Sequence, residues 1–240
     1  MKHFSFQILI LIFSYKLSYT QVSNGYDTQL NFNQFVNTGA GSQTVVRQMK
    51  PMSHGIEGSP YYSERFIKGK IQIKGQVFYP VDINLDLIDN NLLAIRDRKS
   101  SPLVLDKGAV ELFSFEFYPD SIVHFKKILV RNIELFVQLV AKNNTTEIYL
   151  NRVKRIRKAD NSGPYSRGLN YDQIYEEFEY FRKDLLTNEV QLIDTRKRNL
   201  PHLFPGEEAK VSGFLKLNSF SIREVQGLNS FFVYMIESTN

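Results

Sequence analysis

Five cationic side chains lie within seven consecutive residues of the chain: Arg152, Lys154, Arg155, Arg157 and Lys158. Guanidinium and ammonium groups bind phosphate and carboxylate oxygens through charge-assisted hydrogen bonds. This basic run is therefore our candidate binding site for an anionic ligand, such as a phosphorylated lipid head group or a polyanionic glycan. The alternative is the solvated end of a strand, in which the two intervening apolar residues pack while the cations face water. The alternative needs no ligand, and the sequence favours it.

A second short pattern, Asp82-Ile83-Asn84-Leu85-Asp86, imitates the opening of a calcium-binding loop. Such a loop needs a glycine at its sixth position for a sharp turn and a glutamate at its twelfth. Leu87 occupies the sixth position here, and the residues between the polar ones are apolar. We therefore expect a strand with three polar groups on one face, and we assign no metal ligands.

The histidines do not have the spacing of a catalytic or metal site. His54, His124 and His202 are widely separated, with no pair at the spacing of zinc ligands. No nucleophile elbow, phosphate-binding loop or dinucleotide-binding glycine pattern occurs. A Ser-His-Asp triad can still assemble from distant residues, so an envelope-directed hydrolase remains the alternative function. We assign no catalytic and no cofactor-binding residues, and we expect no cofactor.

The elements that must position these groups belong to an ordinary globular chain. Of its 240 residues, 42% are hydrophobic and 23% are charged, which excludes wholesale disorder. The chain contains no cysteine, which rules out disulfides, zinc–thiolate sites, iron–sulfur clusters and cysteine nucleophiles. The length predicts one domain, or one domain with an appendage.

Residues 1–20 have the pattern of a secretory signal peptide. Lys2 and His3 precede about a dozen mainly apolar residues, fewer than the ~20 that a membrane-spanning helix needs. Cleavage after Thr20 would lower the net charge from +5 to +3, because Lys2 and Lys16 leave with the peptide and no acid does. We therefore expect an exported, soluble protein in the periplasm or outside the cell, with no nucleic-acid partner and no later transmembrane segment.

The mature chain is expected to begin with an extended segment over residues 21–57, with one short strand at most. An antiparallel β domain follows over residues 58–194, because the hydrophobic period is two. Alternation from Val77 to Leu87 predicts one long strand with a single apolar face. The other expected strands are 66–73, 92–95, 103–105, 109–118, 121–125, 133–142, 147–156 and 189–193. Residues 171–186 fit a strand or a helix. Short strands joined by tight turns indicate a meander that forms a sandwich or an open barrel.

Residues 195–240 are expected to form a helical cap packed on the sheet. Thr195 can cap a short helix that ends at Pro205-Gly206, and two glutamates then suit the first turn of the next helix. Ser221 to Glu224 form a capping box. Beyond it Val225, Leu228, Phe232, Met235 and Ile236 share one helical stripe. The predicted class is therefore β-rich α+β.

Several motifs together resemble uncharacterised exported proteins of Bacteroidota-type bacteria. They are Gly58-Ser59-Pro60-Tyr61, Val77-Phe78-Tyr79-Pro80-Val81, Thr146-Glu147-Ile148-Tyr149-Leu150 and Leu200-Pro201-His202-Leu203-Phe204-Pro205, with Gln21 directly after the signal peptide. The resemblance implies export, a meander of strands and a closing helical segment, and it brings no catalytic residues. The acidic stretch Tyr175–Phe181 departs from the pattern.

These observations favour a non-catalytic binding or envelope-interaction module that uses a face or groove of its sheet. Aromatic pairs such as Tyr61-Tyr62 and Phe231-Phe232 could line a groove, although core packing is their commoner role. The expected partner is an envelope protein, a glycan or a lipid.

Overall fold

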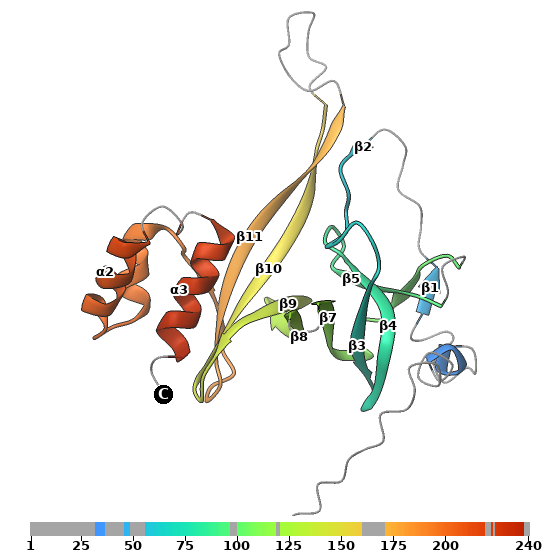
Figure 1. Cartoon of the computed structure of the whole chain (residues 1–240), viewed down its shortest axis with the longest axis horizontal. Helices are drawn as coiled ribbons and strands as arrows, with labels where there is room; N and C mark the ends of the chain where they lie inside the picture. Colours follow the sequence, from blue (N-terminus) through green and yellow to red (C-terminus); the bar gives the residue numbers. More distant parts are fainter. Residues whose placement is uncertain are drawn as a thin grey trace, which may run out of the picture.

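The structure is a computed structural model that describes residues 32–36, 46–48, 56–96, 100–118, 121–159, 171–218, 222 and 224–237. The predicted signal peptide, His54, the predicted turn at residues 119–120 and the predicted capping box at Ser221 lie wholly or partly outside the described residues. Figure 1 shows the strands, with the C-terminal helices gathered on one side of them.

The described part of the chain is rich in strands, as its sequence predicts. The strands are β1 (Val46–Gln48), β2 (Ile56–Glu57), β3 (Ile67–Ile73), β4 (Gln76–Asp86), β5 (Asn91–Ile95), β6 (Leu103–Leu105), β7 (Val110–Tyr118), β8 (Ser121–Val130), β9 (Ile133–Lys142), β10 (Thr146–Arg157), β11 (Asp172–Asp184) and β12 (Val190–Ile193). The C-terminal helices are η1 (Lys197–Leu203), α2 (Glu208–Leu217) and α3 (Val225–Glu237). A further helical stretch covers residues 32–36, inside the segment that was expected to be extended.

All twelve described strands belong to one open sheet. Eleven follow the order β1-β6-β5-β4-β3-β7-β8-β9-β10-β11-β12, and β2 pairs with β11 outside this order. Strands β3 to β6 extend the sheet in one direction, and β7 then pairs with the other edge of β3 and starts a second run. Every pairing is antiparallel except that of β2, which lies parallel to β11. The predicted antiparallel, β-rich class is confirmed, and its form is an open sheet that does not close into a barrel.

The β3–β4 hairpin forms where it is expected, but one of its faces differs from the prediction. Lys74 and Gly75 both have positive φ, at 48° and 77°, which suits a two-residue hairpin turn. The expected alternation fails before Pro80, because Phe78 is buried while Val77 is 50% exposed. Between the pairs Gly69–Val81 and Ile71–Phe78, β4 advances by three residues while β3 advances by two, so β4 has one extra residue. That extra residue reverses which side chains face the core.

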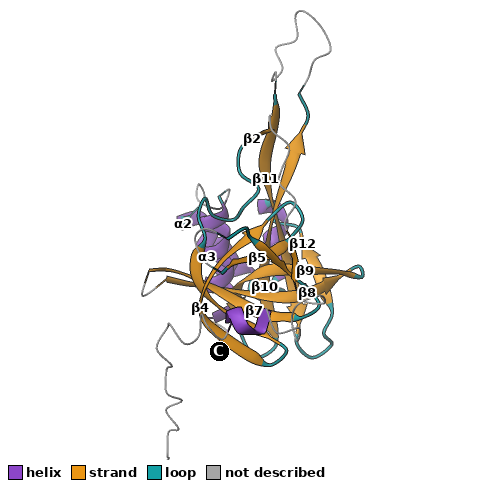
Figure 2. Cartoon of the chain, turned by 90° about the vertical axis from the view of Figure 1, so that its right-hand side faces the viewer, coloured by secondary structure: helices purple, strands orange, loops and turns teal. Residues whose placement is uncertain are grey.

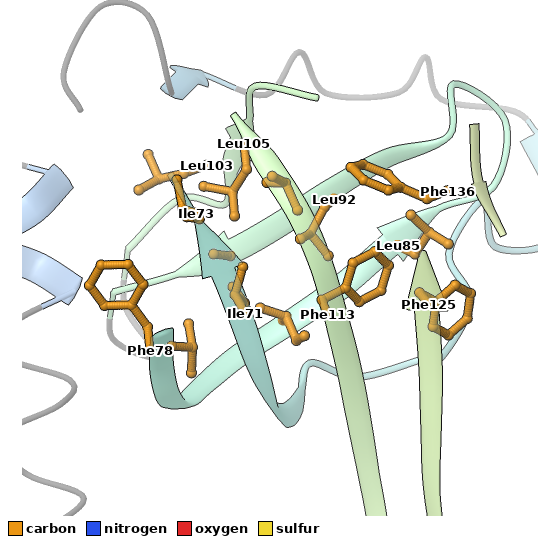
Figure 3. Packing of buried hydrophobic residues seen from close by; sticks show 14 of the residues in the cluster. Ile71, Ile73, Phe78, Leu85, Leu92, Leu103, Leu105, Phe113, Phe125 and Phe136 are labelled. Carbon is orange, nitrogen blue, oxygen red and sulfur yellow. The ribbon is translucent and has the colours of Figure 1, made fainter. Parts of the chain in front are cut away.

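The first core fills the curled half of the sheet formed by β3 to β9. Phe113 is fully buried at its centre, stacked on Phe125 at 4.7 Å between ring centroids and edge-on to Phe136 at 5.3 Å. Figure 3 shows these rings among aliphatic side chains from several strands. Phe32, from the helical stretch at 32–36, packs edge-on against Phe78. Aromatic contacts between strands β7, β8 and β9, and between the helical stretch and β4, therefore help to hold this half together.

The second core lies between the helices and strands β9 to β12. Four of the five residues in the predicted stripe of α3 are buried there with Phe231, and Val225 is partly buried against them. Ile148 and Leu150 of β10 and Tyr180 of β11 face them from the sheet. Residues 171–186, which fitted either a strand or a helix, contain strand β11.

The start of the helical cap differs from the prediction in one detail. Thr195 is not the cap of η1, which begins at Lys197 after Arg196 and has no side-chain cap. Instead the Asp194 carboxylate accepts hydrogen bonds from the Arg196 backbone N–H at 3.0 Å and from Asn199 Nδ2 at 2.7 Å. Gly206, with φ of 84°, ends this segment, and Glu208 lies in the first turn of α2 as expected.

The sheet forks between β9 and β10. These strands pair only through Glu147 to Leu150 and then separate. The β4–β5 turn enters the fork and contacts both strands: Leu87 O accepts from Lys154 N on β10, and the Asn90 side chain bonds the backbone of Phe136 on β9. The turn therefore supplies hydrogen-bond partners to backbone groups that the separating strands cannot give each other.

Candidate interaction surfaces on strands β8 to β12

The predicted basic run, except Lys158, forms the distal half of β10, in a ribbon with β11 that projects from the sheet and carries β2 paired to β11 near its end (Figures 1 and 2). The antiparallel register places the acidic stretch of β11 directly beside it, so that Lys154 is opposite Glu176 and Val153 opposite Glu177. The acidic stretch Tyr175–Phe181 therefore supplies the counter-charge of the basic run.

Two of the five cations face inward, across the base of the ribbon. Arg152 Nε donates to Glu176 at 2.7 Å, and its guanidinium lies 4.7 Å from the centre of the Tyr62 ring. Lys154 Nζ donates to the carbonyl oxygens of Ser59 at 2.9 Å and Tyr61 at 2.6 Å. Burial lowers the pKa of Lys154. These two cations attach the Ser59–Tyr62 segment to the ribbon.

The other three cations are nearer the end of the ribbon and more exposed. Arg155 pairs with Glu177 at 2.6 Å and Lys158 with Asp172 at 2.7 Å. The guanidinium of Arg157 lies 4.9 Å from the centre of the Tyr175 ring. An anionic ligand at this end would have to compete with Glu177 and Asp172 for two of the three cations.

A second surface, which the sequence did not single out, lies on the sheet face opposite the helices. We call it the open face. The strand registers align Leu139, Tyr149, Phe181 and Leu192 in a row across β9 to β12. Neighbouring residues on the same strands point to the opposite face and contact the helices; they are Ile148, Leu150 and Tyr180. The apolar cluster of the open face contains only residues of β8 to β12: Ile128, Val130, Leu135, Val137, Leu139, Tyr149, Phe181 and Val190.

A buried carboxylate lies in the open face beside this row. Glu147 is only 3% exposed and binds Lys126 Nζ at 2.6 Å and Lys142 Nζ at 3.2 Å. The Tyr149 hydroxyl also donates to it. Burial alone would raise the pKa of Glu147, but the hydrogen bonds from Lys126, Tyr149 and Lys142 lower it overall. Burial and the neighbouring carboxylate raise the pKa of Tyr149, so the hydroxyl remains a donor.

Apolar side chains at both margins of the open face remain exposed. Ile133 at the start of β9 is 62% exposed, and Leu192 on the edge strand β12 is 58% exposed. The sequence of β9 could have indicated this surface, because the strand has apolar side chains on both faces. Leu135, Val137 and Leu139 lie on one face and Phe136 on the other. Such a strand is typical of a position buried on both faces. Among the described helices, the cap covers only the other face of β9 to β12.

The remaining candidate residues that the structure describes lie on three separate elements, β4, β8 and η1. His124 is on β8 and His202 in η1. Asn84 is buried and donates to Ser63 O at 2.7 Å, while the Asp86 carboxylate accepts from Ile88 N at 2.9 Å. Within the described residues no group of three or more histidine, aspartate or glutamate side chains could hold a metal ion.

In the part of the chain that the structure describes, no helix combines the length and apolar character needed to cross a membrane. No protein-family model, no curated protein and no solved structure matches this chain. Its surfaces must therefore be interpreted from their own chemistry.

Proposed function

We propose that the chain is an exported, non-catalytic binding module, in the periplasm or outside the cell, that docks another envelope protein on its open face. The observation that carries the proposal is the exposure of Ile133 and Leu192 at the margins of an apolar cluster whose members are buried or partly buried. Exposed apolar side chains that continue an apolar cluster onto the surface are characteristic of a site of protein–protein contact.

The chemistry of the open face favours a protein partner over a glycan. Glycan binding relies on exposed aromatic rings, and the rings of this surface, Tyr149 and Phe181, are 1% and 4% exposed. The side chains that extend outward are aliphatic. A partner with its own aliphatic surface complements them.

The same face is less suited to an anionic lipid surface. Lipid binding by lysines needs ammonium groups available to the head groups. Lys126 and Lys142 are instead held on the Glu147 carboxylate. The bound lysines form a polar margin beside the apolar row, as in the rim of a protein interface.

The edge strand β12 supports the same assignment. It pairs with β11 through Val190 to Ile193, and no described strand pairs with its other edge. A partner segment that lies along this edge could continue the row that ends at Leu192.

The test compares Leu192→Glu with Leu217→Glu in the mature protein. Leu217 is the matched control because it is 87% exposed and lies on α2, away from the open face. Both variants should keep the unfolding midpoint within a few degrees of the parent. Only Leu192→Glu should release the protein from its envelope complex on native gels.

Photo-cross-linking supplies a second readout in the native cells. A benzophenone amino acid at position 192 should give a discrete protein adduct, which Ile133→Glu diminishes, whereas position 217 should give none. Equal adducts at positions 192 and 217, or an unchanged complex with Leu192→Glu, would contradict the proposal.

A further inference from the structure

The cap contains a shallow pocket between η1 and α2. It has a volume of about 320 Å³ and is lined by Lys197, Pro201, Ser212, Leu215 and Lys216. This volume is at the lower end of the range for small-ligand sites, which are clefts of roughly 300–1,000 Å³. The pocket is separate from the open face, because the cap packs on the other face of the sheet.

The two helical elements give the pocket an apolar floor and a cationic margin. Ser212, Leu215 and Lys216 are spaced at i, i+3 and i+4, so they share one face of α2. Leu215 is 9% exposed and belongs to the second core, and Pro201 adds apolar surface from η1. Lys197 and Lys216 contribute one ammonium group from each element.

Three acids near η1 and α2 are engaged elsewhere. Asp194 pairs with Arg196, and Glu207 pairs with Lys210 at 2.9 Å. The Glu208 carboxylate accepts from Gly206 N at 3.0 Å. Lys197 and Lys216 form no ion pair with an acid among the described residues. The pocket therefore presents two cations and a hydroxyl around an apolar floor, and its lining includes no carboxylate.

We propose that this pocket binds a small amphiphilic anion: a carboxylate or phosphate group held between Lys197 and Lys216, with a short apolar body on Leu215 and Pro201. Charge-assisted hydrogen bonds from two ammonium groups select the anion. The apolar floor selects against a bare ion, because burial of an alkyl chain adds affinity that acetate cannot provide. Ser212 can donate a further hydrogen bond to the same head group.

The experiment titrates the mature, isotopically labelled protein with octanoate below its micelle concentration, followed by backbone amide NMR shifts. Octan-1-ol, octylammonium and acetate are the comparison probes. Octanoate should shift the amides of η1 and α2 at concentrations where the other three do not. Octyl phosphate in a parallel titration distinguishes a phosphate head group from a carboxylate.

Two variants and one control locate the site. Lys197→Gln combined with Lys216→Gln should weaken octanoate binding about tenfold, from the loss of two exposed ion pairs. Ser212→Trp should abolish binding by filling the pocket, and it leaves the core intact because Ser212 is exposed. Arg198→Gln, which removes a neighbouring cation of η1 that does not line the pocket, should have no effect. Equal binding of octan-1-ol, or octanoate binding that the double variant retains, would overturn the assignment.

Discussion

The side-chain amide of Asn90 bonds both main-chain groups of Phe136. Its Nδ2 donates to Phe136 O at 3.0 Å, and Phe136 N donates to its Oδ1 at 2.7 Å, across 46 residues of sequence. One turn residue thereby replaces, for one residue of β9, the strand partner that β10 would otherwise provide. The fork in the sheet depends on these two hydrogen bonds from Asn90, because unpaired buried backbone groups lower stability.

We predict that Asn90→Ala lowers the free energy of unfolding by about 2–3 kcal/mol, because it leaves a buried donor and a buried acceptor without partners. Asn90 also has a positive φ of 54°, which alanine tolerates poorly. Asn90→Gly removes the amide without that conformational cost and isolates the hydrogen-bond contribution. Urea unfolding measures both variants, and an unchanged midpoint for Asn90→Gly would refute a structural role for the amide.

The Glu147 network should make stability depend on pH. The pKa of Glu147 in the folded protein is lowered below its ordinary value of 4.5, so its contribution is fully present above that value and is lost as the pH falls through the lower, folded-state pKa. Glu147→Gln should therefore destabilise the protein near neutral pH and differ progressively less from the parent as the solution becomes acidic. Thermal unfolding from pH 7 to pH 3 measures this difference. A constant difference across the range would be inconsistent with the assigned shift.

Arg152 and Arg155 lie three residues apart on β10 but should respond differently to substitution. Arg152→Ala should lower the unfolding free energy by roughly 1–3 kcal/mol, because it removes a partly buried hydrogen bond to Glu176 and the contact with the Tyr62 ring. Arg155→Ala should change stability little, because its pair with Glu177 is exposed to solvent. Chemical denaturation of the two variants side by side checks the order, and a larger effect at Arg155 would reverse our interpretation of the basic run.

Gly58 should not tolerate a larger residue. Its φ of +103° is a conformation that side-chain-bearing residues rarely adopt, and a Cβ there would meet the Cβ of Ile174 at 3.1 Å. Gly58→Ala should cost about 1–3 kcal/mol from backbone strain. Gly213→Ala is the matched control, because nothing lies within 4 Å of its added Cβ and helical alanine is favourable. If both variants are equally stable, the Gly58–Tyr61 segment is not held as the structure describes.

Much of the fold could be predicted from the sequence, because strand and turn preferences are local. An apolar run before the Asn143-Asn144-Thr145 turn located β9 at residues 133–142, as observed, and Lys74-Gly75 identified the first hairpin turn. The stripe on α3 predicted its buried face, and the acids at residues 207–208 indicated the start of α2. Each of these signals lies within a few residues of the feature that it predicts.

Features that depend on residues distant in sequence could not be predicted in the same way. The extra residue that changes which β4 side chains face the core before Pro80 is visible only in the pairing of β4 with β3. The basic run and the acidic stretch were both evident, but only the β10–β11 register pairs Arg155 with Glu177. The open face and the pocket of the cap were hidden for the same reason. The row from Leu139 to Leu192 and the pocket between Lys197 and Lys216 each join segments that are apart in the sequence.

The sequence by itself therefore determined the elements: strands from alternation, turns from glycine and asparagine, and helices from their apolar stripes. The tertiary structure alone decided how the sheet forks, which cations are neutralised and which sheet face the helices leave open. The physical reason is that hydrophobic period and backbone preference act over a few residues, whereas register, charge pairing and burial depend on contacts between distant segments. Asn90 illustrates both contributions. Its residue type predicts a turn, but only its position beside Phe136 makes it the hydrogen-bond partner of a strand.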